Sequence, residues 1–301
     1  MRILVLGSSG FLGSYLGFAL PRLGHDVSGI SRRDVPFFPD NHVIPELESV
    51  ANEIGAGNYD IVINCIAVAS HEACEADPIE ADKVNATLPG IWAAAAWESN
   101  SGFVQISTDA VFDGSSTELY EEGDVTTPES VYGKTKGRGE QMVLASHPQA
   151  LILRTNFFGW SRNHTIGILD FFVNALSQQS SITGFQDYVV SSLYVGDLVD
   201  AMVELANRKY SGVFHAVSST PLSKYEFGQM VAGVMGLSDH SMAAGSIAEA
   251  AGLAPRGRHL GLSVAKIQEA LGTVMPSTEQ GIHRALAERG ALMDYFGVSK
   301  E

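Results

Sequence analysis

The feature that most constrains the fold of this chain is a glycine-rich loop close to its beginning. Glycines stand at positions 7, 10 and 13 of the stretch Gly7-Ser8-Ser9-Gly10-Phe11-Leu12-Gly13. The apolar run Ile3–Leu6 before it predicts a buried strand, and apolar residues at helical spacing after it predict a helix that stops at Gly24. Such glycines allow a tight turn, let backbone N–H groups approach a pyrophosphate, and let the helix pack closely on the strand. A plain strand-to-helix turn is the alternative, but the context favours a dinucleotide site, with Gly7, Ser9, Gly10, Phe11, Leu12 and Gly13 as its residues.

The rest of the chain alternates short apolar runs with segments of helical period. This alternation is typical of a parallel sheet with helices on both faces. We therefore predict an α/β fold, a doubly wound parallel sheet of the Rossmann type. A helix is expected from about Ile79 to Ser99, and strands are expected at Ile3–Leu6, Asp26–Ile30, Asp60–Ala67, Phe103–Ser107, Ala150–Arg154 and Gly212–Val217.

A smaller C-terminal lobe is expected to be interleaved with this sheet. The segment Gly159–Leu193 has a different character, with most of the aromatic and Gln/Ser-rich stretches. No Pro/Gly/Ser-rich linker separates the two parts, so we expect them to share one continuous core. The predicted division gives residues 1–158 to a dinucleotide-binding domain, completed by about 187–218, and gives residues 159–186 and 219–301 to a substrate-binding lobe.

Helices dominate the sequence after Ser219. Ser223 is expected to cap one helix, because a serine hydroxyl can accept a hydrogen bond from a free N–H of the first turn. Ser263 is expected to cap a second helix that ends at Gly272, and Pro276 is expected to open a third.

Charge and cysteine content exclude several classes of function. The formal net charge is -15, from 19 Lys plus Arg against 34 Asp plus Glu. Such a surface repels phosphate backbones and anionic lipids, so we expect no nucleic-acid partner and no membrane partner. No apolar run is long enough to span a bilayer, and the first residues lack the pattern of a signal peptide. Cys65 and Cys74 cannot form a disulfide framework, so a cytoplasmic location is expected.

The end of the second predicted strand indicates which dinucleotide is bound. An NAD site usually has an acidic residue there, which accepts a hydrogen bond from the ribose 2′-hydroxyl. This chain has Ser31-Arg32-Arg33, and Asp34 follows only after both arginines. Two guanidinium groups and a hydroxyl suit a 2′-phosphate better. We therefore expect NADP(H) as the cofactor, with use of NAD left open; arginines that merely face solvent are the alternative.

Three further residues indicate acid–base chemistry. Tyr132 and Lys136 are four residues apart, which on a helix places both side chains on one face. A nearby ammonium group lowers the pKa of a phenol and brings it closer to the working range of a general acid or base. An exposed helix pair would explain this spacing alone. However, Thr108 lies 24 residues earlier, at the end of an apolar strand, where α/β sheets present functional groups.

These signals, in this order, resemble the extended short-chain dehydrogenase/reductase superfamily. Several stretches narrow the resemblance to the dTDP-4-dehydrorhamnose reductase family. Residues 107–114 (STDAVFDG) resemble its "STDYVFDG", and residues 132–140 (YGKTKGRGE) resemble its "YGKTKLxGE". Residues 153–155 (LRT) match the start of its "LRTSWVYG", and residues 60–67 (DIVINCIA) resemble its "DVVINCAA". The resemblance covers the chain nearly end to end.

The resemblance implies a reductase of a keto group on a nucleotide-activated deoxysugar, an enzyme of deoxysugar biosynthesis. It implies that Tyr132 donates a proton to the substrate ketone and that Thr108 orients the carbonyl. Lys136 would bind the nicotinamide ribose and lower the pKa of Tyr132, while the cofactor supplies the hydride. The predicted cofactor contacts beyond the glycine loop are Ser31, Arg32, Arg33, Ile66, Ala67, Val68, Asn85, Ser107, Tyr132 and Lys136.

Substrate contacts are predicted on the same grounds at Val111, Phe112, Asn156, Phe157 and Arg256. Arg154, Arg256 and Arg258 are the candidates to bind a substrate pyrophosphate. The chain departs from the family where Ala110 replaces a tyrosine and where residues 156–160 (NFFGW) replace "SWVYG". These departures lie near the sugar site of the family and bear on which sugar is used.

Two other functions remain open at this point. One is a nucleotide-sugar epimerase or dehydratase of the same superfamily, which recycles a tightly bound NAD. The other is a non-catalytic NADP-binding regulatory subunit. A homodimer is expected because the superfamily commonly pairs through helices beside the active site; the segment Trp92–Trp97 and the Tyr132 helix are the candidate surfaces.

Two weaker patterns receive plain interpretations. His71, Glu72, Cys74 and Glu75 cluster, but we interpret them as the start of a solvated loop, and no metal is expected. Residues 118–129 contain five acidic residues and no basic one, which predicts an exposed loop between the Thr108 strand and the Tyr132 helix.

Overall fold

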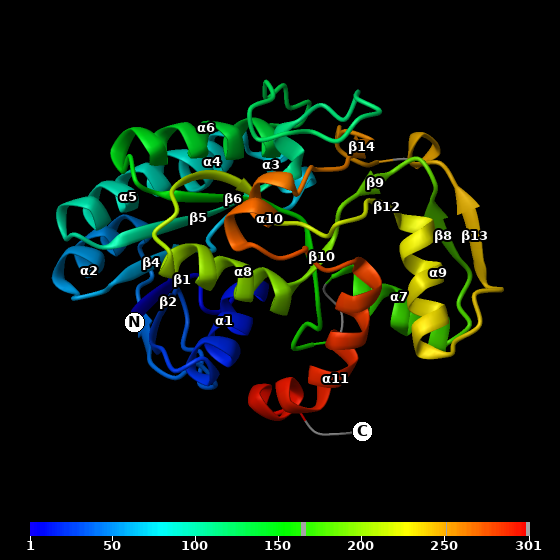
Figure 1. Cartoon of the computed structure of the whole chain (residues 1–301), viewed down its shortest axis with the longest axis horizontal. Helices are drawn as coiled ribbons and strands as arrows, with labels where there is room; N and C mark the ends of the chain where they lie inside the picture. The colour runs from blue at the N-terminus through cyan, green and yellow to red at the C-terminus, as the bar shows by residue number, and fades with distance from the viewer. Residues whose placement is uncertain (164–166, 251, 299–301) are drawn as a thin grey trace.

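The computed structural model describes residues 1–163, 167–250 and 252–298. Its central sheet has seven parallel strands in the order β11-β6-β5-β4-β1-β2-β3, and helices cover both faces (Figure 1). This arrangement confirms the predicted α/β fold with a doubly wound parallel sheet. The strands are β1 (Arg2–Leu6), β2 (Asp26–Ser31), β3 (Asn41–Val43), β4 (Ile61–Asn64), β5 (Gly102–Thr108), β6 (Leu151–Thr155) and β11 (Gly212–His215).

Alternate residues of β1 belong to two separate hydrophobic cores. Ile3 and Val5 pack into the core beneath α1 and α8, whereas Leu4 and Leu6 pack into the core beneath α2, α5 and α6. Both faces of the strand are buried, which is why its sequence is continuously apolar rather than alternating. The helices that cover the sheet are α1 (Phe11–Arg22) and α8 (Val195–Asn207) on one face, and α2 (Val50–Ala56), α5 (Leu88–Glu98) and α6 (Val131–Ser146) on the other.

The strand predicted at residues 60–67 ends early, at Asn64. The side-chain oxygen of Asn64 accepts a hydrogen bond from the backbone N–H of Ile66 at 3.0 Å. A side chain that bonds its own backbone two residues on competes with the sheet ladder and turns the chain. The prediction of strand for residues 65–67 is therefore wrong, and these residues form an irregular segment at the carboxyl edge of the sheet. The last predicted strand likewise ends early, at His215.

The helix predicted from Ile79 to Ser99 is interrupted. The structure has α4 (Pro78–Asp82), then a π-helical turn, η2 (Lys83–Thr87), and then α5. Pro89 has no N–H to donate to the carbonyl of Asn85, four residues before it, so the regular ladder cannot continue there. Gly139 of α6 packs against this carbonyl, since a Cβ at Gly139 would lie only 2.2 Å from the Asn85 oxygen. The turn thus brings Asn85 against the helix that carries Tyr132.

A second group of elements lies to the right of the sheet in Figure 1. Phe172 and Phe227 from this group share one buried cluster with Ile3 of the central sheet, so the core is continuous, as expected. The division into residue ranges given above remains a prediction, and its last residues, 299–301, lie outside the described part. The elements are α7 (Ile168–Ser177), α9 (Lys224–Met235), the strand pairs β7 (Phe157–Phe158) with β10 (Leu193–Tyr194) and β8 (Ile182–Phe185) with β13 (Met242–Gly245), and the three-stranded sheet of β12 (Leu222–Ser223), β9 (Val189–Val190) and β14 (His259–Leu260).

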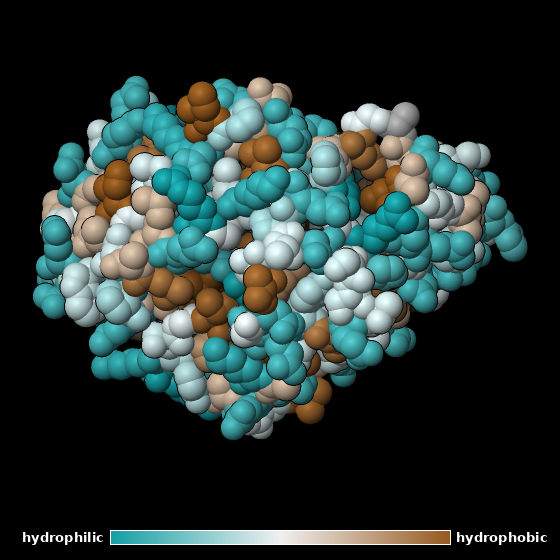
Figure 2. All heavy atoms as spheres, turned by 90° about the horizontal axis from the view of Figure 1, so that it is seen from above, coloured by the Kyte–Doolittle hydropathy of each residue, from teal (hydrophilic) through white to brown (hydrophobic). Residues whose placement is uncertain are grey.

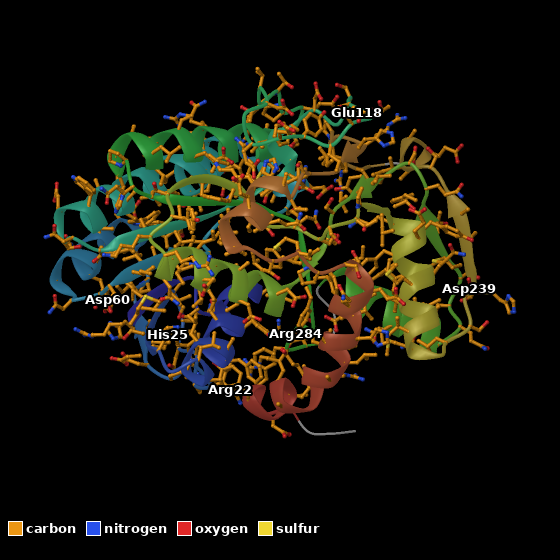
Figure 3. All side chains as sticks on the ribbon, in the orientation of Figure 1. Arg22, His25, Asp60, Glu118, Asp239 and Arg284 are labelled. Atoms are coloured by element: carbon orange, nitrogen blue, oxygen red, sulfur yellow. The ribbon has the colours of Figure 1, made fainter. Side chains whose placement is uncertain are left out.

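The remaining helices are short, apart from the last. They are α3 (His71–Ala76), α10 (Ala265–Leu271) and α11 (Thr278–Phe296), with single 3-10 turns at η1 (Leu47–Ser49), η3 (Asp109–Val111) and η4 (Ile247–Glu249). Arg284 of α11 faces α8 (Figure 3) and donates hydrogen bonds to Asp197 and Asp200, each at 2.6 Å. Glu288, one turn further along α11, accepts a hydrogen bond from Tyr194 at 2.9 Å. These contacts fix the C-terminal helix against the sheet domain.

The capping residues of α9 and α11 show where two of the predicted helices begin. Ser223 caps α9 as predicted, through a capping box with Glu226. The start predicted at Pro276 is wrong by two residues, because Ser277 forms a capping box with Gln280 and α11 begins directly after it.

The helix predicted between Ser263 and Gly272 is α10. It begins at Ala265, with Val264 as the flanking residue, and the Ser263 hydroxyl lies 3.4 Å from the Ala265 nitrogen, too far for a firm cap. The predicted cap is therefore wrong. Gly272 ends the helix in the left-handed conformation, with φ of 71°, as its position predicted.

The surface is predominantly polar on the face seen from above. Hydrophilic side chains cover most of it, and apolar ones appear in small separate groups (Figure 2). Within the described ranges, no helix is both long enough and apolar enough to cross a bilayer.

Candidate active site

The glycine loop joins β1 to α1, and the backbone explains two of its glycines. Gly7 has φ of 90°, a conformation that other residues rarely adopt. A Cβ on Gly13 would lie 2.0 Å from the Gly7 carbonyl oxygen, so only glycine lets the helix pack this closely. The first turn of α1 has no side-chain cap and no acidic residue. Its N–H groups are therefore available to an anion, which fits the predicted pyrophosphate.

A pocket of about 530 Å³ adjoins this loop. Ser9, Gly10 and Phe11, three of the predicted cofactor contacts, form one side of it, and Arg32 and Arg33 line it from the end of β2. The neighbouring predicted residues face elsewhere: the Leu12 side chain is buried in the core, and the Ser31 hydroxyl donates a hydrogen bond to the Arg33 carbonyl.

Arg162 lines the same pocket from a distant part of the sequence. Its guanidinium carbon lies 4.9 Å from the centre of the Phe37 ring, another wall residue, and this cation–π contact holds the side chain in place. Sequence analysis missed Arg162, because no motif links it to the strand end 130 residues earlier. The pocket thus gathers three positive side chains in a protein of net charge -15.

Thr108, Tyr132 and Lys136 come together at the carboxyl edge of the sheet. Ser130 caps α6 by accepting a hydrogen bond from the N–H of Gly133, so Tyr132 stands in the first turn and Lys136 one turn later. Thr108 ends β5 and interacts with the Tyr132 hydroxyl. The Lys136 ammonium donates a hydrogen bond to the carbonyl of Ile106, on the same strand, at 2.6 Å.

Burial controls the protonation of this group. It raises the pKa of Tyr132 above its ordinary value, and the hydrogen bond from Thr108 opposes this shift. Burial also lowers the pKa of Lys136 to about 8, with the Glu140 carboxylate acting in the opposite direction. The direction at Tyr132 is thus contrary to the predicted lowering, because desolvation of the phenolate outweighs the hydrogen bond from Thr108.

Asn85 is fully buried, and its side chain holds the backbone of the segment Ile66–Val68. Its side-chain oxygen accepts a hydrogen bond from the N–H of Val68 at 2.8 Å, and its amide nitrogen donates to the Val68 carbonyl and to the Thr135 hydroxyl, both at 3.1 Å. These bonds tie the segment Ile66–Val68, which includes Ala67, to α6. The sequence predicted a cofactor contact at Asn85, but its side chain is committed to positioning.

Ser107 and Arg154, two further predicted ligand contacts, are hydrogen-bonded within the protein. Glu140 accepts a hydrogen bond from the Ser107 hydroxyl and binds the Arg154 guanidinium through two oxygens, with the shortest contact 2.8 Å. The Arg154 and Glu140 side chains are each only 6% exposed. The assignment of Arg154 to a substrate pyrophosphate is therefore wrong, because an Arg154 that turned to a ligand would leave the buried Glu140 carboxylate without its partner.

The predicted substrate contacts divide into buried and accessible residues. Val111 and Phe112 lie in the core, and the Phe112 ring stacks on that of Tyr120 with 4.2 Å between centres. Their side chains are not presented to a ligand, because the η3 turn directs them inward. Phe157 is half-buried and stacks on Phe11 beside the glycine loop, with 5.8 Å between ring centres.

The remaining two predicted substrate residues are already bonded within the protein. The Asn156 amide donates a hydrogen bond to Asp109 at 2.9 Å. Arg256 is paired with Glu72, which accepts a hydrogen bond from it, and the Arg256 side chain is 18% exposed. Arg258, the third arginine candidate, is largely exposed and lies 4.0 Å from the Asp187 carboxylate.

Sequence analysis missed two residues near Tyr132 and Asp109: Tyr188 interacts electrostatically with Tyr132, and Lys224 interacts electrostatically with Asp109. Tyr188 and Lys224 both lie in this region, with the Lys224 ammonium 5.5 Å from the centre of the Tyr188 ring. Burial raises the pKa of Tyr188, with a further contribution from Asp109, and burial lowers the pKa of Lys224 to about 8. Lys224 follows the predicted cap Ser223 directly, but nothing in its neighbourhood marks it as a site residue.

His71 is also part of this region. Its ring lies 4.8 Å from the ring of Tyr132, centre to centre. The sequence singled out His71 only as a member of a cluster with Glu72, Cys74 and Glu75. Among the residues that the structure describes, no three His, Cys, Asp or Glu side chains are grouped as metal ligands.

The acidic segment 118–129 connects β5 to α6, as predicted. Glu118 projects from the outer rim of this loop (Figure 3). Other residues anchor the segment: the Tyr120 hydroxyl donates to Asp113 at 2.7 Å, and Glu122 accepts a hydrogen bond from the N–H of His215 at 3.0 Å. The loop is therefore fixed to the body of the protein at its centre.

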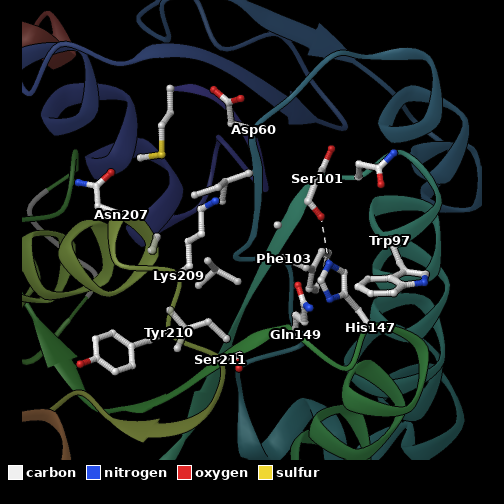
Figure 4. A pocket seen from close by; sticks show the side chains of 17 residues that line it. Asp60, Trp97, Ser101, Phe103, His147, Gln149, Asn207, Lys209, Tyr210 and Ser211 are labelled. Atoms are coloured by element: carbon white, nitrogen blue, oxygen red, sulfur yellow. Dashed lines mark hydrogen bonds between the residues drawn. The ribbon is translucent and has the colours of Figure 1, made fainter. Parts of the chain in front are cut away.

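A second cavity, of about 1160 Å³, lies at the opposite edge of the sheet. Its walls include residues at the start of β4 and β5 together with Trp97, His147 and Lys209, and none of the predicted site residues (Figure 4). His147 bonds the Ser101 carbonyl there at 3.0 Å. Functional groups of parallel sheets gather at the carboxyl ends of the strands, so we place the active site at the Thr108 edge.

Comparisons with known proteins agree with this geometry. The family model described as "RmlD substrate binding domain" matches residues 1–290. The probable low-salt glycan biosynthesis reductase Agl14 of Haloferax volcanii is 32% identical over 301 residues, 98% of this chain and 99% of that protein. The dTDP-4-dehydrorhamnose reductase of Mycobacterium tuberculosis is 32% identical over 235 residues, 74% of this chain and 72% of that protein.

Solved structures show the same fold. A dTDP-4-dehydrorhamnose reductase from Clostridium acetobutylicum is 26% identical, with a TM-score of 0.83 over 96% of this chain and 100% of that one. A dTDP-4-dehydrorhamnose reductase from Bacillus anthracis, solved in complex with NADP, is 24% identical, with a TM-score of 0.84 over 95% of this chain and 98% of that one.

Proposed function

This chain belongs to the RmlD substrate-binding domain family, and from that premise we propose that it is an NADP(H)-dependent reductase of a keto group on a nucleotide-activated deoxysugar. The observation that carries the proposal is the meeting of Thr108, Tyr132 and Lys136 at the sheet edge next to the glycine loop. The reductase names of relatives 32% identical to this chain, which span most or all of it, support the reaction class.

The cofactor assignment rests on the shape and charge of the loop and pocket. The uncapped N-terminus of α1 leaves free N–H groups for a pyrophosphate, and Gly13 lets this helix end pack close to the Gly7 turn. Arg32, Arg33 and Arg162 supply positive charge for a 2′-phosphate, which favours NADP over NAD. Bound NADPH would supply the hydride that reduces the carbonyl carbon. The NADP complex of the Bacillus anthracis relative supports this assignment.

Tyr132 is suited to donate a proton. Reduction of a ketone requires an acid that keeps its proton until charge develops on the carbonyl oxygen. The raised pKa of Tyr132 keeps the phenol neutral at physiological pH, so the proton is present when the substrate binds. Thr108 would hold the carbonyl oxygen beside the phenol, and Lys136 would bind the ribose hydroxyls from its position one turn further along α6.

Enzyme assays test this proposal directly. Purified protein, NADPH and a panel of nucleotide-linked 4-keto-6-deoxy sugars should show loss of nicotinamide absorbance. Tyr132→Phe should lower kcat by about 1000-fold, since it removes the proton donor and leaves the ring in place. Tyr210→Phe is the matched control, because Tyr210 is exposed and its hydroxyl donates to the Ala270 carbonyl. Full activity of Tyr132→Phe would disprove the assigned mechanism.

We also propose that the protein is cytoplasmic and forms a homodimer. Ile91 and Trp97 of α5 are each nearly half exposed, which supports a contact through this helix, whereas Trp92 is fully buried in the core and is not available. Light scattering of the wild type and of Ile91→Glu tests the dimer: the substitution should give a monomer if α5 forms the contact. A dimer that persists unchanged would rule out this surface.

A further inference from the structure

A continuous chain of hydrogen bonds leads from Ser192, between β9 and β10, to Thr108. The Ser192 hydroxyl donates to the Asn156 side-chain oxygen at 2.8 Å, and the Asn156 amide nitrogen donates to Asp109 Oδ2 at 2.9 Å. The other carboxyl oxygen of Asp109, Oδ1, lies 3.0 Å from Thr108 Oγ1. Because Oδ2 accepts from the Asn156 amide, the proton of a neutral Asp109 would lie on Oδ1, which faces Thr108.

The chain decides where the single hydrogen of the Thr108 hydroxyl points. Thr108 Oγ1 already accepts a hydrogen bond from the N–H of Ala110 at 3.1 Å. If Asp109 is ionised, it can only accept, so Thr108 must give its hydrogen to Asp109. If Asp109 carries a proton on Oδ1, it donates to Thr108 instead, and the Thr108 hydrogen can point to the Tyr132 hydroxyl, its partner in the protein alone, or to a ligand bound there.

The reaction needs the second arrangement. A group that holds a ketone oxygen, and stabilises the charge that develops on it, must donate a hydrogen bond to that oxygen. We propose that Asp109 is a positioning residue that works in its neutral form: it donates to Thr108, so that Thr108 donates to the substrate carbonyl beside Tyr132. This inference rests on the proposed function and names a residue that the family resemblance did not assign.

The surroundings of Asp109 favour the neutral form. The residue is 4% exposed. Burial raises its pKa, while the bonds with Asn156 and Thr108 and the charge of Lys224 act in the opposite direction. The titratable groups that face it are Lys224 at the start of α9, Tyr132 on α6 and Tyr188 before β9. Of these only Lys224 can carry a positive charge; with a pKa of about 8 it is still mostly charged at pH 7, so it opposes the effect of burial on Asp109.

Substitutions of Asp109 separate the two arrangements. In Asp109→Asn, the amide oxygen would accept from Asn156 and the amide N–H would donate to Thr108, as the neutral acid does. We expect kcat within about threefold of the wild type for Asp109→Asn, and a loss of about 100-fold with little change in KM for Asp109→Ala. Asp109→Asn should also remain active at high pH, where the wild type loses activity as Asp109 ionises. Asp239→Asn, far from the site in Figure 3, is the matched control.

A double substitution tests whether Asp109 acts only through Thr108. Thr108→Val removes the hydroxyl, so Asp109→Ala should then cause no further loss of kcat. A kcat of Asp109→Asn as low as that of Asp109→Ala would overturn the proposal, because it would show that the carboxylate is required. Unchanged activity of Asp109→Ala would overturn it as well. NADPH binding and thermal unfolding of each variant identify any that fails to fold.

A measurement without substrate keeps the proposal separate from the proposed function. The carboxyl ¹³C resonance of Asp109, identified by its loss in Asp109→Asn, should remain at the position of a neutral acid at pH 7. A resonance of an ionised carboxylate at that pH would overturn the proposal even in an active enzyme. If the wild type reduces no sugar of the panel, the proposed function fails, but this spectrum still decides the state of Asp109.

Discussion

The Asn85 amide nitrogen and the Thr135 hydroxyl oxygen lie 3.1 Å apart, and this hydrogen bond joins the π-helical turn to α6, the helix that carries Tyr132. Thr135 in turn donates to the carbonyl of Tyr132 at 3.0 Å. Since Asn85 also bonds the backbone N–H and C=O of Val68, one buried side chain connects the segment Ile66–Val68 with the first turn of α6.

Asn85→Ala should therefore destabilise the protein and also loosen the segment Ile66–Val68, which Asn85 holds. It leaves the Val68 N–H without its bond, so we expect the free energy of unfolding to fall by about 2 kcal/mol. Urea denaturation measures this change. Asn207→Ala, at an exposed position, is the control and should stay within about 0.5 kcal/mol of the wild type. Equal stability of the two variants would show that the Asn85 bonds contribute nothing net.

Gly13→Ala tests the close approach of α1 to the glycine loop. The added methyl group would collide with the Gly7 carbonyl at 2.0 Å, so the loop must shift, and we expect a loss of about 1–3 kcal/mol in stability. NADPH binding, followed by fluorescence titration, should weaken at least about tenfold. Gly290→Ala in α11 meets no atom within 4 Å and should slightly stabilise the helix. Unaltered NADPH affinity of Gly13→Ala would argue against a pyrophosphate at this turn.

The pH dependence of stability reports on Lys136. Its pKa is about 8 in the folded protein, against 10.5 ordinarily, so between these values the unfolded chain binds more protons. Unfolding free energy then rises with pH in this window, by about 1.4 kcal/mol per pH unit at most. The wild type should thus gain stability relative to Lys136→Met from pH 8 to 10. Lys209→Met, at an exposed site, provides the comparison, and a flat difference for Lys136→Met would contradict a depressed pKa.

Arg162→Ala tests whether this arginine contributes to the recognition of a 2′-phosphate. Calorimetry with adenosine 2′,5′-bisphosphate and with 5′-AMP separates the phosphate from the rest of the nucleotide. Loss of one charge-assisted contact should lower the affinity for the bisphosphate by about tenfold and leave the affinity for 5′-AMP nearly unchanged. Arg22→Ala serves as the control, since Arg22 packs on Phe18 and bonds its carbonyl, away from the pocket. Parallel loss for both nucleotides would assign Arg162 to another part of the cofactor.

Local pattern was enough to predict the sheet and the main chemical groups. Each strand that was predicted exists, and the glycine loop, the Thr108 strand end and the four-residue spacing of Tyr132 and Lys136 occupy one edge. These features depend on short stretches of chain, because hydrophobic period, turn chemistry and helical spacing are local properties. The π-helical turn at Lys83–Thr87 was not predicted, although Pro89 lacks the N–H that a regular helix would require at that point.

The partners of the polar groups were not readable in this way. Arg154 was predicted to bind substrate, yet it forms an ion pair with Glu140 on α6. Asn156 was predicted to bind substrate as well, yet its amide donates a hydrogen bond to Asp109. Lys224 and Tyr188 carried no signal in the sequence, and nevertheless Lys224 interacts with Asp109 and Tyr188 with Tyr132. The sequence by itself determined which groups the protein has and which strands and helices carry them. Only tertiary packing decided which are buried and already bonded, because burial and pairing arise between residues far apart in the chain, and no local pattern records them.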